Sequence, residues 1–548
     1  MACDVLVIGG GPVGMLLAID LAARGVTVTL VEARPAGQLP SVKCNHIASR
    51  TMETFRRLGL SRAVRAVGLP DDFPNDIVFR TRMTGKEMAR IRIPSRQDRY
   101  TATGGPDTDW PTPEPPHRVN QIHFEPILFA RAAADPRITI LSHCRFISAT
   151  QDPDGVSATI ERLDDGSTIT LQARYMAGCD GGTSTVRKLI GGQLEGDAVI
   201  QRVQSTLIDS PALLGALGSG PAWMSYNYNP ERAGTVLAID GIRRWLVHNY
   251  LLPDEADFDS IDRDAGIRAI LGVDDDFPIE IVANEDWIGR RLVADVFRKD
   301  RIFIAGDAAH LWVPYAGYGM NAGIADAMNL SWLLAGVVQG WASPDILDAY
   351  VAERKPITEQ VSRFAMSHAA RAIRERTTLP PEIEDDTPEG EAARAQVGEA
   401  AYRLNVQQFA CAGLNYGYFY DASPIIAYDG DAQPAYTMHD YVPSTVPGCR
   451  VPHFVVADGR PLYDLLGAGY SLLVFDRSVD TAPIVEAAAR CGLPLSVLHF
   501  DRTLDRVPAE YTHNLLIARP DGHVAWRGNA IDDPSGLVDR LRGAAREP

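Results

Sequence analysis

The chain has 548 residues, enough for about three or four domains of ordinary size. Its 46% hydrophobic and 22% charged residues are typical of a globular protein and exclude a disordered, collagen-like or coiled-coil chain. Because 53 Lys and Arg face 70 Asp and Glu, the net charge of −17 argues against a nucleic acid as a partner.

The seven cysteines occur without C-x-x-C spacing, which indicates neither a disulfide framework nor a zinc site and favours a reducing cytoplasm. The most apolar window, residues 5–23, contains Asp20 and a glycine cluster and has no basic residue before it. It therefore lacks the pattern of a signal peptide or a membrane span. We expect a cytoplasmic protein with no membrane and no metal as partner.

The first elements form a βαβ pattern. Residues 4–8 (DVLVI) are an apolar, β-branched run typical of a strand buried on both faces. A glycine cluster follows, then a helical pattern through residue 24 with Gly25 as its stop, and then a second strand over residues 26–31 that ends at Glu32. Strand, helix and strand in this order predict a parallel α/β sheet.

Two later regions are predicted to form further strands. Residues 138–180 hold three alternating runs separated by D-P-D-G and D-D-G turns, which predicts an antiparallel meander. Residues 76–111 and 190–287 combine Trp, Tyr and β-branched residues with loops. We expect them to form a second sheet inserted into the first domain.

The second half of the chain begins with a predicted strand over residues 301–305, which leads into Gly306 and Asp307 and then into a long helix over about residues 321–338. The proline- and acid-rich residues 380–391 are expected to be an exposed linker or loop. Beyond residue 447, strands and helices alternate for about a hundred residues, enough for a separate C-terminal domain.

The glycine cluster carries the first chemical signal. Gly9-x-Gly11-x-x-Gly14 lies between the predicted strand and helix, and Glu32 closes the next strand. Glycines there let backbone N–H groups approach a pyrophosphate at the helix start, and the carboxylate accepts hydrogen bonds from ribose hydroxyls. The pattern predicts a dinucleotide site for FAD or NAD and does not separate the two.

Two later segments resemble those of a known family. Residues 176–187 (MAGCDGGTSTVR) resemble the Asp-Gly motif, and residues 301–321 (RIFIAGDAAHLWVPYAGYGMN) the Gly-Asp motif, of the single-component flavin-dependent aromatic hydroxylases. p-Hydroxybenzoate hydroxylase and phenol hydroxylase are members. The motifs LDAY (347–350) and ERKP (353–356) follow in the same order. Residues 448–548 are similar to the thioredoxin-like C-terminal domain of the phenol-hydroxylase-type members.

This resemblance implies an α/β architecture with four regions. They are a discontinuous Rossmann-type FAD-binding domain (1–75, 112–189 and 288–370), an inserted substrate-binding sheet domain (76–111 and 190–287), a helical or linker region (371–447) and a thioredoxin-like α/β domain (448–548). Because the C-terminal domain has no C-x-x-C, we expect it to serve packing or a homodimer and not thiol redox chemistry.

The resemblance also implies a set of FAD-binding residues around the glycine turn. In the family, Asp307 contacts the ribityl chain, Arg50 approaches the pyrophosphate, and the loop that opens the long helix stabilises negative charge on the reduced flavin. This chain has Ala316 and Tyr318 where Gly and Gln are usual. The predicted cofactor-binding residues are Gly9, Gly11, Pro12, Gly14, Glu32, Arg34, Arg50, Gln121, Asp180, Gly306, Asp307, Pro314, Gly319, Met320 and Asn321. As alternatives, Arg50 and Gln121 are surface residues, and Asp307 is a helix cap.

A phenolic substrate must share its hydroxyl proton to become electron-rich, so a base within hydrogen-bond reach is expected. In phenol hydroxylase the base lies about five positions before the matched arginine. Here Asn45 occupies that position and His46 lies beside it, so we predict His46 as the base, with a packed core histidine as the alternative.

Aromatic residues on two alternating runs of the inserted sheet are candidates for the substrate pocket, with Tyr226 as a predicted catalytic residue. The alternative is that they form simple core or cross-strand pairs. The candidates are Trp223, Tyr226, Tyr228, Trp245, His248 and Tyr250.

The predicted function is that of a monooxygenase that binds FAD, consumes NAD(P)H and O₂, and hydroxylates a phenolic or polycyclic aromatic ring through a flavin hydroperoxide. No second G-x-G-x-x-G follows a strand, so NADPH or NADH is expected to bind transiently in a groove. The alternatives are a Baeyer–Villiger oxidation, a flavin reductase and a non-catalytic FAD-binding scaffold. A halogenase is disfavoured because no tryptophan is followed two residues later by another.

Overall fold

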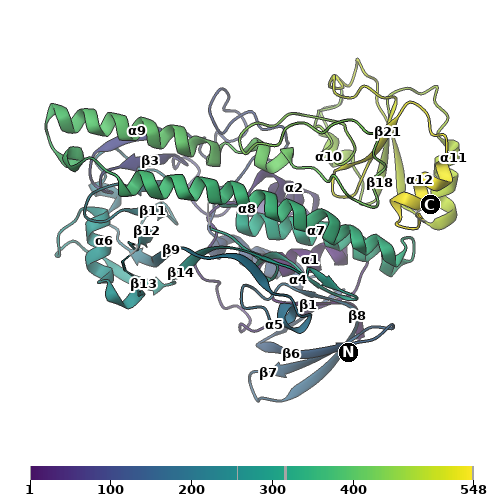
Figure 1. Ribbon diagram of the computed structural model, residues 1–548, viewed down its shortest axis with the longest axis horizontal. Coiled ribbons are helices and arrows are strands. Elements are labelled where there is room, and N and C mark those ends of the chain that lie inside the picture. Colours follow the sequence, from purple (N-terminus) through teal and green to yellow (C-terminus); the bar gives the residue numbers. More distant parts are fainter. Residues whose placement is uncertain (1, 253, 256, 314–316, 546–548) are drawn as a thin grey trace.

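The computed structural model describes residues 2–252, 254–255, 257–313 and 317–545. Three β-sheets with helices packed around them lie side by side along the molecule (Figure 1). The predicted α/β class, with a dinucleotide-type domain, a second sheet and a C-terminal domain, is confirmed.

The first sheet contains the predicted βαβ unit. β1 (Ala2–Ile8) pairs in parallel with β2 (Val28–Glu32), and α1 (Pro12–Ala23) connects them. Because α1 packs against both α4 (Gln121–Ala133) and α7 (Tyr318–Gln339), every residue from Met15 to Ala22 is buried. This burial on all sides explains why the window resembles a membrane segment in its composition.

The predicted antiparallel meander starts later than expected. β5 (Ile138–Ser142) pairs in parallel with β2, and the meander is formed by β6 (Cys144–Gln151), β7 (Val156–Arg162) and β8 (Thr168–Gly178). The predicted first run is broken at His143, which has a φ of 54°. A left-handed residue cannot continue a strand, so the chain bends there. The sheet is completed by β15 (Arg298–Lys299) and β16 (Ile302–Ile304).

The second sheet is built from two segments far apart in the sequence. β3 (Ile77–Arg80) and β4 (Glu87–Ile91) join it through the parallel pairing of β3 with β10 (Met224–Asn227). Its other strands are β9 (Leu194–Asp209), β11 (Gly234–Ala238), β12 (Arg244–Tyr250), β13 (Glu280–Asn284), β14 (Trp287–Ala294) and β17 (His310–Leu311). The sheet therefore reaches the Gly306-Asp307 segment at one edge.

Two long helices follow the sheets. α8 (Asp348–Thr377) and α9 (Pro388–Phe409) run along the molecule, and α9 packs against β3 and β4 (Figure 1). The prediction of an exposed linker or loop over residues 380–391 is right for Pro381 and residues 385–389, which are exposed, but the segment is not free of the domain. Ile383 is fully buried, Glu384 pairs with Arg82 at 2.7 Å, and the Thr387 side chain caps α9. An apolar anchor and a helix cap hold this segment against the second sheet.

The C-terminal domain has a four-stranded sheet of β18 (Tyr470–Val474), β19 (Leu495–His499), β20 (Leu515–Ala518) and β21 (Val524–Gly528). Its helices are α10 (Leu462–Leu465), α11 (Ala482–Cys491) and α12 (Pro534–Leu541). Arg519 of this domain pairs with Glu353 of α8 at 2.5 and 2.7 Å, and both side chains are fully buried. The domain is therefore part of one packed body.

Shorter helices lie in the connections between strands. They are α2 (Ser49–Arg57), α3 (Ser61–Arg65), α5 (Thr185–Leu189) and α6 (Arg263–Leu271).

Candidate functional site

The glycine turn after β1 leaves open space only at its middle glycine. A Cβ on Gly9 would overlap the carbonyl oxygen of Cys179, and one on Gly14 would overlap the carbonyl oxygen of Gly9. A Cβ on Gly11 would meet no described heavy atom within 4 Å beyond its chain neighbours. Packing therefore requires Gly9 and Gly14. Gly11 instead faces open space at the start of α1, whose first residue is Pro12 and whose N–H groups suit a pyrophosphate.

A line of charged and polar side chains runs from the end of β2 to the start of α4. Glu32 accepts a hydrogen bond from the N–H of Gly10 at 2.6 Å and pairs with Arg34 at 3.1 Å. Arg34 also pairs with the buried Glu125 at 2.7 Å, and Glu125 accepts a hydrogen bond from Gln121 at 2.5 Å. The structure thus brings Glu32, Arg34 and Gln121 together, and it orients the Glu32 carboxylate beside the glycine turn.

A buried acid holds the Gly306-Asp307 turn. The fully buried Asp326 of α7 accepts hydrogen bonds from Gly306 N–H at 3.2 Å, His310 Nε2 at 2.7 Å and Arg354 Nε at 2.8 Å. Burial alone would raise the pKa of Asp326, but His310 and Arg354 hold it below its ordinary value. Asp326 is therefore ionised and positions Asp307, whose carboxyl lines the large cavity described below.

The start of α7 forms the next wall. Gly317 has a φ of 59°, and a Cβ there would lie 2.9 Å from the Cβ of His46. Gly319 and Met320 lie in the first turn, where N–H groups have no partner within the helix, and both line the large cavity. The Asn321 side chain, a predicted cofactor residue, forms hydrogen bonds within the protein: it accepts one from Ala48 N–H at 2.9 Å and donates one to the Gly317 carbonyl at 2.7 Å. The predicted Pro314, and Ala316, lie outside the described residues.

The large cavity has a volume of about 340 Å³ and extends from Asp307 and Gly319 across the second sheet to α9. Of the aromatic residues predicted to line it, four do so: Trp223, Tyr226, His248 and Tyr250. Trp245 is fully buried, because it alternates with His248 on β12 and points to the other face of the sheet. Tyr228 follows the end of β10 and packs on Phe79 with ring centroids 6.1 Å apart.

The sequence profile of the FAD binding domain family matches residues 2–365, which include the glycine turn and the Gly306-Asp307 turn. The profile of the aromatic-ring hydroxylase C-terminal family matches residues 444–548. The chain belongs to the FAD-dependent aromatic-ring hydroxylases. The recognition of this family from its motifs is confirmed, as are the FAD-dependent monooxygenase function and the cofactors FAD, NAD(P)H and O₂ that the family implies.

Relatives cover nearly the whole hydroxylase. The tetracenomycin B2 monooxygenase-dioxygenase of Streptomyces olivaceus is 31% identical over 98% of this chain and 97% of its own. The phenol 2-monooxygenase of Pseudomonas sp. is 29% identical over 98% and 92%. Among solved structures, RebC soaked with chromopyrrolic acid and carrying 7-carboxy-K252c is 32% identical, with a TM-score of 0.89 over 100% of both chains. A ternary complex of aklavinone-11 hydroxylase with FAD and aklavinone is 27% identical, with a TM-score of 0.79 over 98% of this chain and 99% of that one.

The surroundings of His46 do not fit the predicted base. Its Nδ1 faces Arg118 Nη1, and a guanidinium can only donate, so Nδ1 carries the lone pair and the neutral ring has its proton on Nε2. Burial and the nearby Arg118, which Asp107 holds at 3.1 Å, place the pKa of His46 well below 6.5. In this arrangement His46 is a neutral donor at the wall of the cavity. Asn45 also lines the cavity, and its side-chain oxygen accepts a hydrogen bond from Asn120 at 2.5 Å.

Two predicted cofactor residues have other contacts in the hydroxylase. Asp180 accepts hydrogen bonds from the Ser184 hydroxyl at 2.5 Å and from Thr185 N–H at 2.7 Å, so it caps the start of α5. Arg50 lies away from the large cavity: its guanidinium covers the ring of Tyr418 at 4.5 Å and contacts His523 of the C-terminal domain at 3.1 Å.

Several residues of the large cavity were missed by the sequence analysis. Lys43 lines it close to Asp307 and pairs with Glu285, and its place two residues before Asn45 was an available signal. Gln408 donates a hydrogen bond to the Tyr226 hydroxyl at 3.3 Å, and Phe409 lies against Trp223 with ring centroids 6.2 Å apart. Both come from the end of α9, and no local pattern links that helix to the cavity.

None of the helices within the described part of the chain is both long and apolar enough to cross a membrane.

Acid should destabilise the hydroxylase from about pH 6.5 downward, because several histidines are buried as neutral rings. Burial lowers the pKa of His117 to about 3 and the pKa values of His248, His368 and His453 to about 4. As the pH falls, the unfolded chain therefore binds protons at these histidines that the folded chain does not bind. The stability contribution is complete above the unfolded pKa and is lost as the pH falls toward the folded one.

At about pH 5, each of these histidines should lower the free energy of unfolding by about 2 kcal/mol. Urea denaturation at about pH 7, 6 and 5 measures this, and His117→Asn should make the dependence on pH shallower. An unchanged free energy over this range would contradict the assignment of neutral buried rings.

Proposed function

We propose that the hydroxylase acts on a polycyclic phenol that lies in the large cavity, with His248 accepting a hydrogen bond from its hydroxyl group. The observation that carries this proposal is the extent of the cavity. Its 340 Å³ falls within the range of roughly 300–1,000 Å³ that holds drug-sized ligands. Its lining continues past Asp307 and Gly319 over β10, β11, β12 and β14 to α9, so the substrate end of the cavity lies between the second sheet and α9.

The apolar part of the lining supports a flat aromatic substrate. Trp223, Trp287 and Leu246 supply apolar surface, which excludes water from the reacting ring. Among the similar proteins, one is named for tetracenomycin B2, one for aklavinone and one for phenol. When bound, FAD supplies the oxygen-activating chemistry, and the N–H groups of Gly319 and Met320 are placed to stabilise negative charge at the start of α7.

Of the two described histidines that line the large cavity, His248 is the one whose pKa is lowered by burial alone, whereas Arg118 faces His46. The Nδ1 of His248 is buried and meets no hydrogen-bond partner among the described residues, and its ring packs edge-on against Trp287 with centroids 5.8 Å apart. Because burial lowers the pKa of His248 to about 4, the ring is neutral near pH 7 and has one nitrogen lone pair. Because His248 lines the large cavity, a substrate hydroxyl there would donate to the nitrogen lone pair of the ring, and sharing its proton would make the aromatic ring electron-rich.

A substrate screen with the purified holoenzyme tests the proposal. NADPH and NADH oxidation is followed with phenol, naphthols, hydroxyanthraquinones and tetracyclic phenols, and products are identified by mass as the substrate plus one oxygen atom. We expect fused-ring phenols to give the greatest coupled turnover. Coupled turnover with single-ring phenols alone would refute the proposal, and a product in which oxygen has entered the ring framework would indicate a Baeyer–Villiger reaction.

Replacing His248 with phenylalanine should lower coupled hydroxylation by about 10²-fold or more without changing the FAD content. In the pH range where the protein stays folded, coupled hydroxylation by the wild type should show no acid limb near the ordinary histidine pKa of about 6.5, because burial lowers the pKa of His248 to about 4. His46→Gln is the matched control, since the glutamine amide keeps a hydrogen-bond donor at this position of the cavity wall. Equal rates for His248→Phe and wild type would remove the role from His248.

A further inference from the structure

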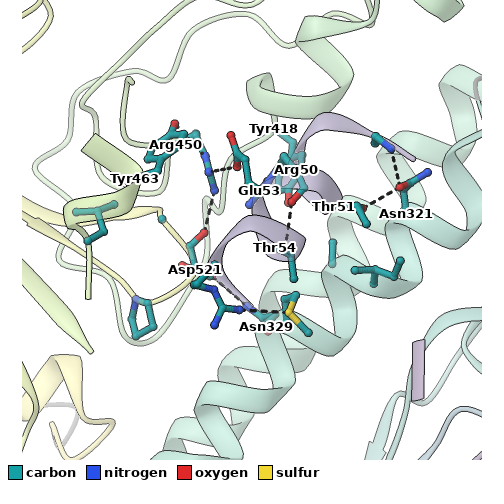
Figure 2. A pocket seen from close by; sticks show the side chains of 18 of the residues that line it. Arg50, Thr51, Glu53, Thr54, Asn321, Asn329, Tyr418, Arg450, Tyr463 and Asp521 are labelled. Atoms are coloured by element: carbon teal, nitrogen blue, oxygen red, sulfur yellow. Dashed lines mark hydrogen bonds and ion pairs between the residues drawn. The ribbon is translucent and has the colours of Figure 1, made fainter. Parts of the chain in front are cut away.

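A second cavity, of about 110 Å³, lies between α2, α7 and the C-terminal domain (Figure 2). Its wall carries paired charges: Arg450 pairs with Glu53, and Asp521 accepts hydrogen bonds from Arg519 at 2.7 and 3.1 Å. An apolar ring placed there would take water from these charges without giving them hydrogen bonds, which costs free energy. A fused-ring substrate therefore suits the large cavity and not this one.

Polar side chains of the large cavity form a row across the second sheet. Tyr226 of β10 lies opposite Thr235 of β11, and Thr235 lies opposite His248 of β12. Residues paired in this way on neighbouring strands point to the same face of a sheet. All three side chains line the large cavity, so the row runs along one wall of it from His248 to Tyr226.

The two ends of the row are two strands apart. Neighbouring strands are about 4.8 Å apart, so the backbones at His248 and Tyr226 are separated by about 10 Å. Between them, the hydroxyl of Thr235 lies 2.7 Å from the hydroxyl of Tyr250. A ligand that lies along this row with a hydroxyl group at His248 therefore meets Tyr226 with its opposite end.

The ring of Tyr226 is held in place by the sheet. It stacks on the fully buried Phe79 of β3, with ring centroids 5.3 Å apart and 8° between the ring planes. Phe79 is also the residue paired with Tyr226 across these two strands. The position of the Tyr226 hydroxyl is therefore fixed, and its chemistry depends on where its proton points.

Two amide side chains of α9 determine that direction. Asn405 Nδ2 donates a hydrogen bond to the Ala401 carbonyl at 2.8 Å, so Asn405 presents its Oδ1 to Gln408. Gln408 Nε2 lies 2.7 Å from this oxygen, which can only accept, so Gln408 faces Asn405 with its NH₂ group. Asn405 and Gln408 are 1% and 2% exposed, so bulk water does not replace these contacts.

The same NH₂ group makes Tyr226 a donor. Gln408 Nε2 lies 3.3 Å from the hydroxyl oxygen of Tyr226. Because the NH₂ group can only donate, the hydroxyl oxygen accepts this hydrogen bond and gives its own proton to a different acceptor. Tyr226 lines the large cavity, so an acceptor oxygen of a bound ligand suits this position.

We propose that Gln408 sets Tyr226 as the hydrogen-bond donor to a carbonyl oxygen at the end of the substrate opposite to its phenolic hydroxyl. This role rests on the proposed function, since His248 defines the other end of the substrate. It narrows the substrate class to fused-ring phenols that also carry a ketone or quinone. Tyr226 is then a specificity-determining residue, and Gln408 is a positioning residue that acts through it.

Equilibrium binding to the holoenzyme tests the role of Tyr226. The two ligands are a linear hydroxyanthracene and the same molecule with an acetyl group at the ring end opposite to the hydroxyl, and binding is followed by the change in flavin absorbance. The ketone preference is the dissociation constant without the acetyl group divided by that with it. Tyr226→Phe should lower this ratio about threefold to tenfold, because one hydrogen bond to the ketone is lost.

Tyr228→Phe is the matched control. It is the same chemical change two residues along the chain, and Tyr228 packs on the same Phe79 ring, but Tyr228 is not among the described residues that line the large cavity. Its ketone preference should equal that of the wild type. Equal ratios in Tyr226→Phe and wild type, or the same fall in Tyr228→Phe, would overturn the role of Tyr226.

Gln408→Met tests the positioning role with Tyr226 intact. The Tyr226 hydroxyl loses the donor that directs its proton, so the ketone preference should fall at least about twofold, while binding of the hydroxyanthracene without the acetyl group changes by less than about twofold. This variant also decides the matter if Tyr226→Phe does not fold. An unchanged ratio in Gln408→Met would overturn the proposal that Gln408 directs the hydroxyl.

The same titrations separate this role from the proposed function. If the wild type binds neither hydroxyanthracene, both the proposed function and the role of Tyr226 fail. If the wild type binds the hydroxyanthracene without the acetyl group and Tyr226→Phe leaves the ketone preference unchanged, only the role of Tyr226 fails. A polycyclic phenol would then remain the proposed substrate.

Discussion

Replacing Gly11 with valine should yield a folded but colourless protein that has lost FAD. The backbone φ at Gly11 is −72°, which any residue adopts, and no described atom opposes a side chain there. The valine would instead fill the space through which the pyrophosphate approaches the N–H groups of α1. Absorbance of the purified protein measures FAD content, and circular dichroism measures folding.

Gly14→Ala is the matched control, because its added methyl group would overlap the carbonyl oxygen of Gly9 and not a ligand. This variant should lose thermal stability as well as FAD. A Gly11→Val protein with full FAD content would contradict the placement of the pyrophosphate at this turn.

Replacing Asp326 with asparagine should lower the free energy of unfolding by about 3–5 kcal/mol and weaken FAD binding. All three partners of the carboxylate, Gly306 N–H, His310 and Arg354, donate hydrogen bonds. An amide would direct its NH₂ group at one of these donors and leave the buried Arg354 without a counter-charge. Urea denaturation and fluorescence titration of the apoprotein with FAD measure the two effects.

Asp307→Asn makes the same chemical change in the turn that Asp326 holds. It separates the effect on FAD binding from the effect on stability. Asp307 faces the large cavity and belongs to no ion pair among the described residues, so its change should weaken FAD binding with little loss of stability. Equal stability of Asp326→Asn and wild type would show that the carboxylate does not hold the Gly306-Asp307 turn.

The hydrogen bonds around Asp326 also link the C-terminal domain to the Gly306-Asp307 turn. Arg354 holds Asp326, and the preceding residue, Glu353, is buried in its pair with Arg519. The ERKP motif of α8 therefore joins two domains through adjacent side chains. This arrangement gives the domain a packing role, in keeping with the absence of a C-x-x-C motif from the sequence.

Local patterns in the sequence were sufficient for the βαβ unit and the cofactor class. The βαβ unit can be recognised from the sequence because its features lie within about thirty residues of one another. These features are the glycine spacing, the apolar run of β1 and the acid at the end of β2. The motifs around Asp180 and Asp307 likewise identify the family by their residues and their order along the chain. They do not show that Asp180 caps α5, because its partners depend on how the turn closes.

The sequence by itself determined the βαβ unit, the family and FAD as cofactor, since these follow from local spacing and from motifs. Only the tertiary structure decided where individual side chains lie. Arg50 meets His523, and Tyr226 meets Gln408, across long separations in the chain. The proton on His46 likewise depends on Arg118, a residue from another segment. Such contacts depend on which face of a helix or strand packs against a distant element. The local hydrophobic periodicity of the sequence does not show which distant element that is.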